Sequence, residues 1–294
     1  MAKVTDLFAR KGRRPLVAFD FSPPRSGDAG FAEAVRGISP DLWCVAYSPG
    51  RAVRLDSVAT AAILKQRTGI EAIANMACRD MNRLALQMHL LGAEALGLQN
   101  VLVLRGDDFA GKDIGRVKPV YDYKPTELIR DITAMNGGTD FKGQKLASPT
   151  SLCAGASIDP NRDPEHEARL AVRKVEAGAQ FIFSQAVYDP AVMVNFLERY
   201  RVASGRALAL PFFWGLQVLV KDGVSFAEVP PSMIAELNAG RSGVDIAVDL
   251  AQRMLAAGCD ALYIVAPILK GGALAASPSS SPVRSPAQAS PANS

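Results

Sequence analysis

Eight short apolar segments recur along the 294-residue chain, each followed by a polar or glycine-containing turn. They contain many β-branched and aromatic residues, which favours buried β-strands over helices. The predicted strands are 16–21, 42–47, 71–78, 100–104, 151–156, 180–184, 208–215 and 261–266. Segments with helical spacing separate these strands, and such regular alternation is typical of an α/β protein with a parallel sheet.

The intervening segments carry helix start and stop signals. Segment 56–67 begins with an acidic residue and is followed by Gly69, and segment 125–135 begins with a proline, which suits the first turn of a helix. The predicted helices are 29–36, 56–67, 80–96, 125–135, 164–177, 190–202 and a region 231–257 that is broken near 238–240; a short helical pattern also covers 4–10.

Eight strands in one chain favour a closed (β/α)8 TIM barrel over an open doubly wound sheet. The open sheet usually has fewer strands and a glycine-rich nucleotide-binding turn near its start. We expect residues 1–270 to form the barrel domain. Residues 271–294 are rich in Gly, Ala, Ser and Pro and cannot bury enough apolar surface to offset their ordering entropy. We therefore predict a disordered low-complexity tail there and no eighth helix.

Charge and cysteine usage limit the classes of partner. The net charge of +4 comes from 33 basic and 29 acidic residues, a balance too even to indicate nucleic acid or a membrane surface. The four cysteines are far apart and form no Cys-x-x-Cys pair, so we predict reduced core thiols in a cytoplasmic protein. The basic start and the longest apolar stretch, 207–220, match neither a signal peptide nor a membrane span. A small-molecule ligand is the remaining expectation.

Three common site motifs are not supported. Residues 106–113 have the spacing of a P-loop, but Asp113 stands where Ser or Thr should bind magnesium. No Gly-x-Gly-x-x-Gly follows an early strand, so a Rossmann nicotinamide site is also unsupported. His89 and His166 are predicted on helices without a cysteine or carboxylate partner at ligand spacing. We therefore predict no metal site.

Polar side chains stand where most of the predicted strands end. The strand 100–104 runs directly into Arg105, Gly106, Asp107 and Asp108. The strand-end residues with hydrogen-bonding side chains are Asp20, Tyr47, Ser48, Asn75, Arg105, Asp107, Asp159, Asn161, Gln185 and Lys270. In a parallel barrel the carboxyl ends of all strands meet at one rim, where barrel enzymes bind their substrates. The pattern therefore predicts a small-molecule site at that rim.

Several ordered motifs also resemble a known family. They are Phe-Asp-Phe-Ser-Pro-Pro-Arg at 19–25, Cys-Arg-Asp-Met-Asn-Arg at 78–83, Leu-Arg-Gly-Asp at 104–107, Arg-Lys-Val-Glu-Ala-Gly-Ala at 173–179 and Phe-Ile-Phe-Ser-Gln at 181–185. Together they resemble methylenetetrahydrofolate reductase, and the motif at 78–83 is closest to the branch also found fused to homocysteine methyltransferase. The resemblance implies a (β/α)8 barrel in which FAD passes a hydride from NADH or NADPH to methylenetetrahydrofolate.

The resemblance also implies roles for individual residues. Asp20 stands at the position of the family's glutamate, which protonates a folate nitrogen, and Asp107 at that of the aspartate beside the flavin and the pterin. The implied substrate-binding residues are Gln185, Glu236 and Lys270. The implied flavin-binding residues are Tyr47, Asn75, Arg105, Gly106, Asp107, Asp159, Asn161, Arg173 and Lys174. Asp20 is one methylene shorter than the family residue, and Lys270 replaces an arginine.

Two other functions remain open at this point. The chain could be a folate-binding methyl-transfer barrel without redox chemistry, or a non-catalytic folate-binding subunit of a larger complex. A missing eighth helix would also leave the outer faces of the first and last strands uncovered. By alternation, we expect Leu16, Ala18, Leu262 and Ile264 to be exposed there. We therefore expect contact with a second copy or another subunit near these strands.

Overall fold

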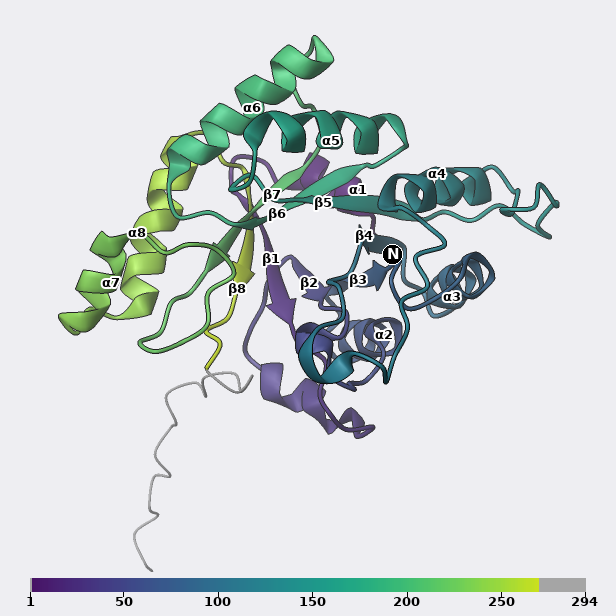
Figure 1. Ribbon diagram of the computed structural model, residues 1–294, viewed down its shortest axis with the longest axis horizontal. Coiled ribbons are helices and arrows are strands. Elements are labelled where there is room, and N and C mark those ends of the chain that lie inside the picture. Colours follow the sequence, from purple (N-terminus) through teal and green to yellow (C-terminus); the bar gives the residue numbers. More distant parts are fainter. Residues whose placement is uncertain (1, 270–294) are drawn as a thin grey trace, which may run out of the picture.

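The computed structural model describes residues 2–269, which form a closed barrel of eight parallel strands in the order β1 to β8 (Figure 1). The strands are β1 (Leu16–Phe21), β2 (Leu42–Val45), β3 (Glu71–Ala77), β4 (Asn100–Leu104), β5 (Cys153–Ile158), β6 (Phe181–Ala186), β7 (Phe212–Gln217) and β8 (Ala261–Val265). The predicted barrel and all eight predicted strands are confirmed. β5, β6 and β7 extend two residues further toward their carboxyl ends than predicted.

Helices surround the barrel, as the alternating pattern predicts. They are α1 (Val4–Arg10), α2 (Ser57–Thr68), α3 (Arg83–Ala95), α4 (Pro125–Asn136), α5 (Pro164–Glu176), α6 (Pro190–Ser204), α7 (Pro231–Asn238) and α8 (Gly243–Ala256), with 3-10 turns η1 (Ala29–Val35), η2 (Pro49–Arg51) and η3 (Gly111–Asp113). The predicted break near 238–240 is confirmed because α7 ends there. The α-helix predicted over 29–36 is wrong, because this segment is the 3-10 helix η1.

The helix predicted from residue 80 begins three residues later, at Arg83. The side chain of Asn82 accepts a hydrogen bond from the backbone N–H of Ala85, at 2.9 Å, and so caps the helix. Asp80 precedes this cap, and its carboxylate accepts two hydrogen bonds from Arg79. An N-terminal cap of this kind outweighs the helical pattern of the two residues before it.

The helix α1 closes the amino end of the barrel. Val4 is fully buried, and its backbone N–H donates to the side chain of Asn100 at the start of β4. The Asn100 amide donates in turn to the carbonyl oxygen of Ala2, and the Ala2 N–H donates to Glu71 at the start of β3. These bonds hold the chain's first residues beneath the strands, so any opening to a site lies at the carboxyl ends.

The expected exposure of Leu16 and Ala18 is wrong. Both side chains are buried inside the barrel, in a cluster with Cys153 and Phe181. The two faces of β1 are therefore exchanged relative to the prediction, and Leu16 and Ala18 point into the barrel. Leu262 does face outward, but it is also buried, in a cluster that includes Leu250 of α8. The predicted tail and the missing eighth helix fall on residues 270–294, outside the described residues.

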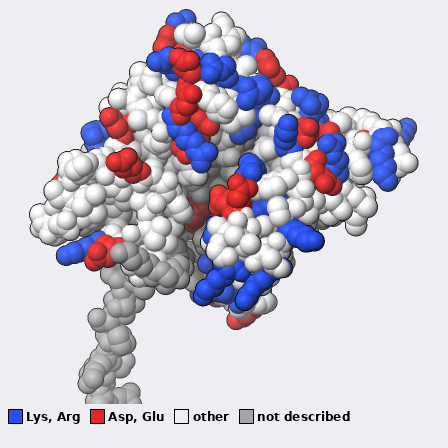
Figure 2. All heavy atoms as spheres, viewed as in Figure 1, with Lys and Arg blue, Asp and Glu red and all other residues white. Residues whose placement is uncertain are grey.

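The surface seen in Figure 2 carries basic and acidic side chains that are interspersed over most of its area. Between residues 2 and 269, no helix combines the length and apolar character that crossing a membrane requires. The four cysteines are all buried and unpaired, as the sequence predicts.

Gly155 on β5 is required by the packing of the barrel interior. A Cβ atom at this position would lie 2.0 Å from the ring of Phe181, which is itself fully buried. The Phe181 ring contacts Phe183 and Phe213 edge to face, so it has no free space into which it could turn.

We expect Gly155→Ala to lower the free energy of unfolding by about 1–3 kcal/mol, because an added methyl group overpacks the interior. Gly92→Ala is the matched control, since Gly92 lies in α3 with open space around its Cα. Alanine is the better helix former and should leave the protein equally or more stable. Urea denaturation followed by circular dichroism measures both; equal midpoints would contradict the packing argument.

Candidate active site

The closed barrel brings the predicted strand-end residues to one rim. Asp20 and Asn75 lie within β1 and β3, near their carboxyl ends, while Arg105 and Asp159 directly follow β4 and β5. Gln185 is the last but one residue of β6 and is exposed. Because all strands are parallel, these side chains share the end of the barrel opposite α1. Lys270 falls outside the described residues.

Asp20 is the acid in the interior of this rim. Its Oδ1 accepts a hydrogen bond of 2.5 Å from the hydroxyl of Tyr263 on β8. Burial raises the pKa of Asp20 from its usual 3.8 to about 6, and the Tyr263 hydrogen bond opposes part of this shift. A carboxyl group with such a pKa is present in both its acid and its base form near neutral pH, which is what a general acid requires.

Two further polar side chains face the same interior. Cys44 on β2 lies opposite Asp20 in the strand register, and its thiol donates to Asn75 Oδ1 at 3.5 Å. Burial and the nearby charge of Asp20 raise the pKa of the Cys44 thiol well above its usual value, so it stays protonated. The Asn75 side-chain N–H groups form no hydrogen bond with any described residue and can donate to a ligand.

Arg79 anchors the loop after β4 from beneath. Its side chain is 5% exposed, and its guanidinium pairs with Asp80 through two hydrogen bonds and donates to the Asp107 carbonyl oxygen at 2.9 Å. The ring of Phe109 stacks on this guanidinium, with its centroid 4.4 Å away. Gly106 has a φ of +84°, and a Cβ there would lie 2.8 Å from Arg79 Cβ. Only glycine fits between this anchor and the exposed Asp107.

The outer part of this loop has its own ion pair. Arg105 Nη2 lies 2.8 Å from Asp108 Oδ1, and the Tyr121 hydroxyl donates to the same oxygen at 2.9 Å. The Arg105 side chain is 56% exposed and stacks on the Tyr121 ring. The Asp107 carboxylate, in contrast, forms no hydrogen bond with the described residues and is open to a ligand.

The structure separates the predicted flavin-binding residues into two groups. Arg105, Gly106 and Asp107 form one continuous loop at the rim. Asn75 comes from β3, and Tyr47 lies in the segment that follows β2. Asp159 instead accepts hydrogen bonds from Asn161 and Arg162. On α5, Arg173 is exposed, whereas Lys174 is buried and its ammonium donates to the Ser157 carbonyl oxygen. Burial lowers the pKa of Lys174 to about 8.

These positions fit a dinucleotide cofactor in part. The exposed guanidinium groups of Arg105 and Arg173 suit a diphosphate, and the free amide hydrogens of Asn75 suit a ring carbonyl or ring nitrogen. Lys174 does not fit this role, because its ammonium is turned to a backbone carbonyl beneath α5. The rim loop therefore carries the cofactor-binding chemistry that the structure supports best.

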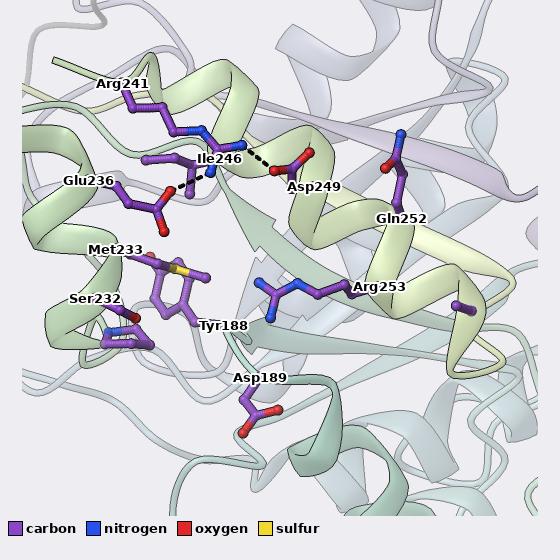
Figure 3. Close-up of a pocket in the computed structure, with 12 residues that line it drawn as sticks. Tyr188, Asp189, Ser232, Met233, Glu236, Arg241, Ile246, Asp249, Gln252 and Arg253 are labelled. Carbon is purple, nitrogen blue, oxygen red and sulfur yellow. Dashed lines mark hydrogen bonds and ion pairs between the residues drawn. The ribbon is translucent and has the colours of Figure 1, made fainter. Parts of the chain in front are cut away.

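Glu236 lies apart from the other predicted substrate-binding residues. It lines a cavity of about 680 Å³ between α7, α8 and the start of α6 (Figure 3), none of whose lining residues belongs to a strand. Its carboxylate pairs with Arg241, which also pairs with Asp249. Glu236 is thus an ion-pair partner in the outer layer, and the structure does not bring it together with Asp20.

The sequence pattern missed Tyr263, Cys44 and Arg79. Tyr263 has a recoverable signal, because it occupies an inward position of the last strand, which must pair with the first strand in a closed barrel. His89 also differs from expectation, since its Nε2 lies 3.3 Å from Asp56 Oδ2. Within residues 2–269 no group of three or more His, Cys, Asp or Glu side chains could hold a metal ion.

The fold and the site define a (β/α)8 barrel with a partly buried acid and a polar rim at the carboxyl ends of its strands, the usual small-molecule site of this fold. The family model described as methylenetetrahydrofolate reductase matches residues 4–269. The chain therefore belongs to the methylenetetrahydrofolate reductase family.

Individual relatives are distant in sequence. Methylenetetrahydrofolate reductase 2 of Schizosaccharomyces pombe is 23% identical over 276 residues, which are 86% of this chain and 43% of that protein. The 5,10-methylenetetrahydrofolate reductase of Pectobacterium carotovorum is 24% identical over 64% of this chain and 60% of its own length. The chain thus spans less than two thirds of either relative.

A solved structure shares the fold. It is an uncharacterized protein from Clostridium thermocellum, described as binding two copies of 5-methyl-5,6,7,8-tetrahydrofolic acid. The TM-score is 0.58 at 14% identity, and the match covers 88% of this chain and 91% of that one.

The raised pKa of Asp20 makes the free energy of unfolding depend on pH. Folding raises this pKa from 3.8 to about 6, so the folded state binds the proton more tightly than the unfolded chain does. The stability contributed by protonated Asp20 is therefore complete below pH 3.8 and is lost as the pH rises through 6.

We expect Asp20→Asn, which cannot ionise, to be more stable than the wild type at pH 8. Two pKa units correspond to roughly 3 kcal/mol. The difference should shrink toward zero near pH 3.5, where the wild-type carboxyl is also neutral. Chemical denaturation at several pH values measures this; a pH-independent difference would contradict the burial of an ionisable Asp20.

Proposed function

We propose that this protein reduces 5,10-methylenetetrahydrofolate to 5-methyltetrahydrofolate in one-carbon metabolism. The observation that carries the proposal is Asp20, a partly buried acid whose pKa is raised to about 6, at the rim of a barrel of this family. The names of the relatives and the folate described for the solved barrel support the same substrate. The residues at the rim can perform the acid chemistry that this reduction needs.

The proposed step begins with Asp20 in its protonated form. Asp20 gives its proton to a nitrogen of the folate's methylene bridge, and the bridge opens to an electrophilic iminium that accepts a hydride. Asp107 stands exposed on the rim loop, where its carboxylate can accept hydrogen bonds from the amino group and ring nitrogen of the pterin. Gln185 lies at the same rim, near the carboxyl end of β6, and its side chain can donate or accept a hydrogen bond there.

We infer FAD as the cofactor and NADH or NADPH as the electron donor. The relatives named as NADH-dependent or NADPH-dependent reductases support the donor, and the exposed guanidinium groups and free amide described above support a dinucleotide. Arg105, Arg173 and Asn75 are the residues that would hold FAD. When bound and reduced by a hydride from NADH or NADPH, the flavin would supply the hydride that the iminium carbon accepts.

The cellular setting and the assembly are also proposals. Four buried free thiols support a cytoplasmic protein.

The outward side chains of Val17, Phe19 and Ile264 remain partly exposed, which supports a contact with a second copy or another subunit across β8 and β1. Sedimentation velocity at micromolar concentration tests self-association, and a single monomeric species would exclude it under those conditions.

The proposal is tested by incubating the purified chain with FAD, NADH or NADPH and methylenetetrahydrofolate, and measuring methyltetrahydrofolate formation. Asp20→Asn should lower this rate by roughly 10²–10⁴-fold, the usual contribution of a general acid. Donor oxidation without folate needs no proton from Asp20 and should stay close to wild type. Methyl transfer from methyltetrahydrofolate with no electron donor would instead support the methyl-transfer function, and folate binding without turnover a subunit role.

A second prediction concerns Asp107. We expect Asp107→Asn, which keeps the side-chain volume and removes the charge, to weaken folate binding by about 1.5–3 kcal/mol, because one charge-assisted hydrogen-bond acceptor is lost. Asp122→Asn is the control, since Asp122 is an exposed aspartate of the same loop. Folate titration followed by fluorescence measures both. Equal affinities in the two variants would show that Asp107 does not contact the folate.

A further inference from the structure

We propose that Tyr263 is a positioning residue that holds the Asp20 carboxyl in the orientation from which its proton reaches the substrate. This inference rests on the proposed function, because it assigns Asp20 as the proton donor. It adds a residue from β8 that neither the motifs nor the family resemblance indicated.

The geometry of Tyr263 is fixed by the barrel itself. In the pairing of β1 with β8, Tyr263 lies beside Ala18, two residues before Asp20 along β1. Its side chain must therefore extend along the barrel axis to place the hydroxyl 2.5 Å from Asp20 Oδ1. The Tyr263 ring packs edge to face against Phe183, with centroids 5.0 Å apart, and Phe183 stacks on Phe213 at 4.4 Å. Buried aromatic packing thus holds the hydroxyl in place.

Within the part of the chain that the structure describes, no cation balances the charge of Asp20. The titratable groups that face it are Tyr263 from β8 and Cys44 from β2. Burial and the charge of Asp20 raise the pKa of Tyr263 well above its usual value, so the phenol keeps its hydrogen. Among residues 2–269 no lysine or arginine contributes to the pKa of Asp20. The Tyr263 hydroxyl is therefore the group that stabilises the Asp20 carboxylate.

This single donor decides which oxygen carries the proton. The phenol has one hydrogen and directs it to Oδ1, so the acidic proton of Asp20 resides on Oδ2. In a carboxyl side chain shorter than that of the family's glutamate, a fixed rotation about χ2 is needed because a displacement of about 1 Å can cost roughly a hundredfold in rate. Loss of the phenol would free that rotation and remove the stabilisation of the carboxylate.

The test is Tyr263→Phe in the full chain, which keeps the packed ring and removes only the hydroxyl. We expect kcat for folate reduction to fall about tenfold or more, with KM for folate changed far less. The alkaline limb of the kcat profile should move up by about one to two pH units, because the carboxylate loses its charge-assisted hydrogen bond. Tyr200→Phe removes a buried tyrosine hydroxyl from α6 and should leave the limb in place.

A direct titration separates this inference from the proposed function. In protein carrying ¹³C-labelled aspartate carboxyls, Asp20→Asn identifies the Asp20 signal, which should titrate near pH 6 in the wild type and higher in Tyr263→Phe. This readout needs no turnover, so an inactive wild type would overturn the proposed function alone. An unchanged Asp20 titration in folded Tyr263→Phe would overturn the inference.

A second variant covers the case in which Tyr263→Phe does not fold. Site-specific replacement of Tyr263 by 3-fluorotyrosine keeps the hydroxyl and makes it a stronger donor, because the fluorine withdraws electrons from the phenol. The Asp20 titration and the alkaline limb should then move to lower pH, opposite to the shift in Tyr263→Phe. Absence of any shift would overturn the positioning role.

Discussion

The pairing of β1 with β8 is the contact on which the fold and the site both depend. It closes the barrel, and it joins Asp20 to Tyr263 across a sequence separation of 243 residues. Without closure, the first and last strands would be open edges that invite other strands to pair with them. With closure, an acid from the first strand lies in an interior where burial raises its pKa to about 6.

Asp20 has no cationic partner among residues 2–269, so its ionisation at neutral pH costs the protein stability. The barrel compensates through the apolar packing below the acid, where Phe181, Phe183 and Phe213 fill the space between α1 and the rim. The helix α1 closes the other end through hydrogen bonds to Asn100. Function and stability are therefore divided along the barrel axis, with polar groups at the carboxyl ends and apolar groups beneath them.

The loop after β4 shows how a charged rim is organised from below. Arg79 is almost fully buried, yet its guanidinium is balanced by Asp80 and by the Asp107 carbonyl oxygen. Burial of a paired arginine costs much less than burial of an isolated one. The result is a rigid support on which Gly106 turns the chain, so that the Asp107 carboxylate faces outward without a protein partner.

Local patterns in the sequence determined the strands, most helices and the rim. Apolar runs and turn residues are local signals, so they predicted a parallel (β/α)8 barrel with Asp20, Asn75, Arg105 and Gln185 at one end. Only the tertiary structure decided which face of β1 is inside and that the Lys174 side chain of α5 is buried against β5. It also decided that Glu236 pairs with Arg241 and that Tyr263 contacts Asp20. These features depend on strand register and on contacts between distant segments, because a shift of one residue exchanges the two faces of a strand.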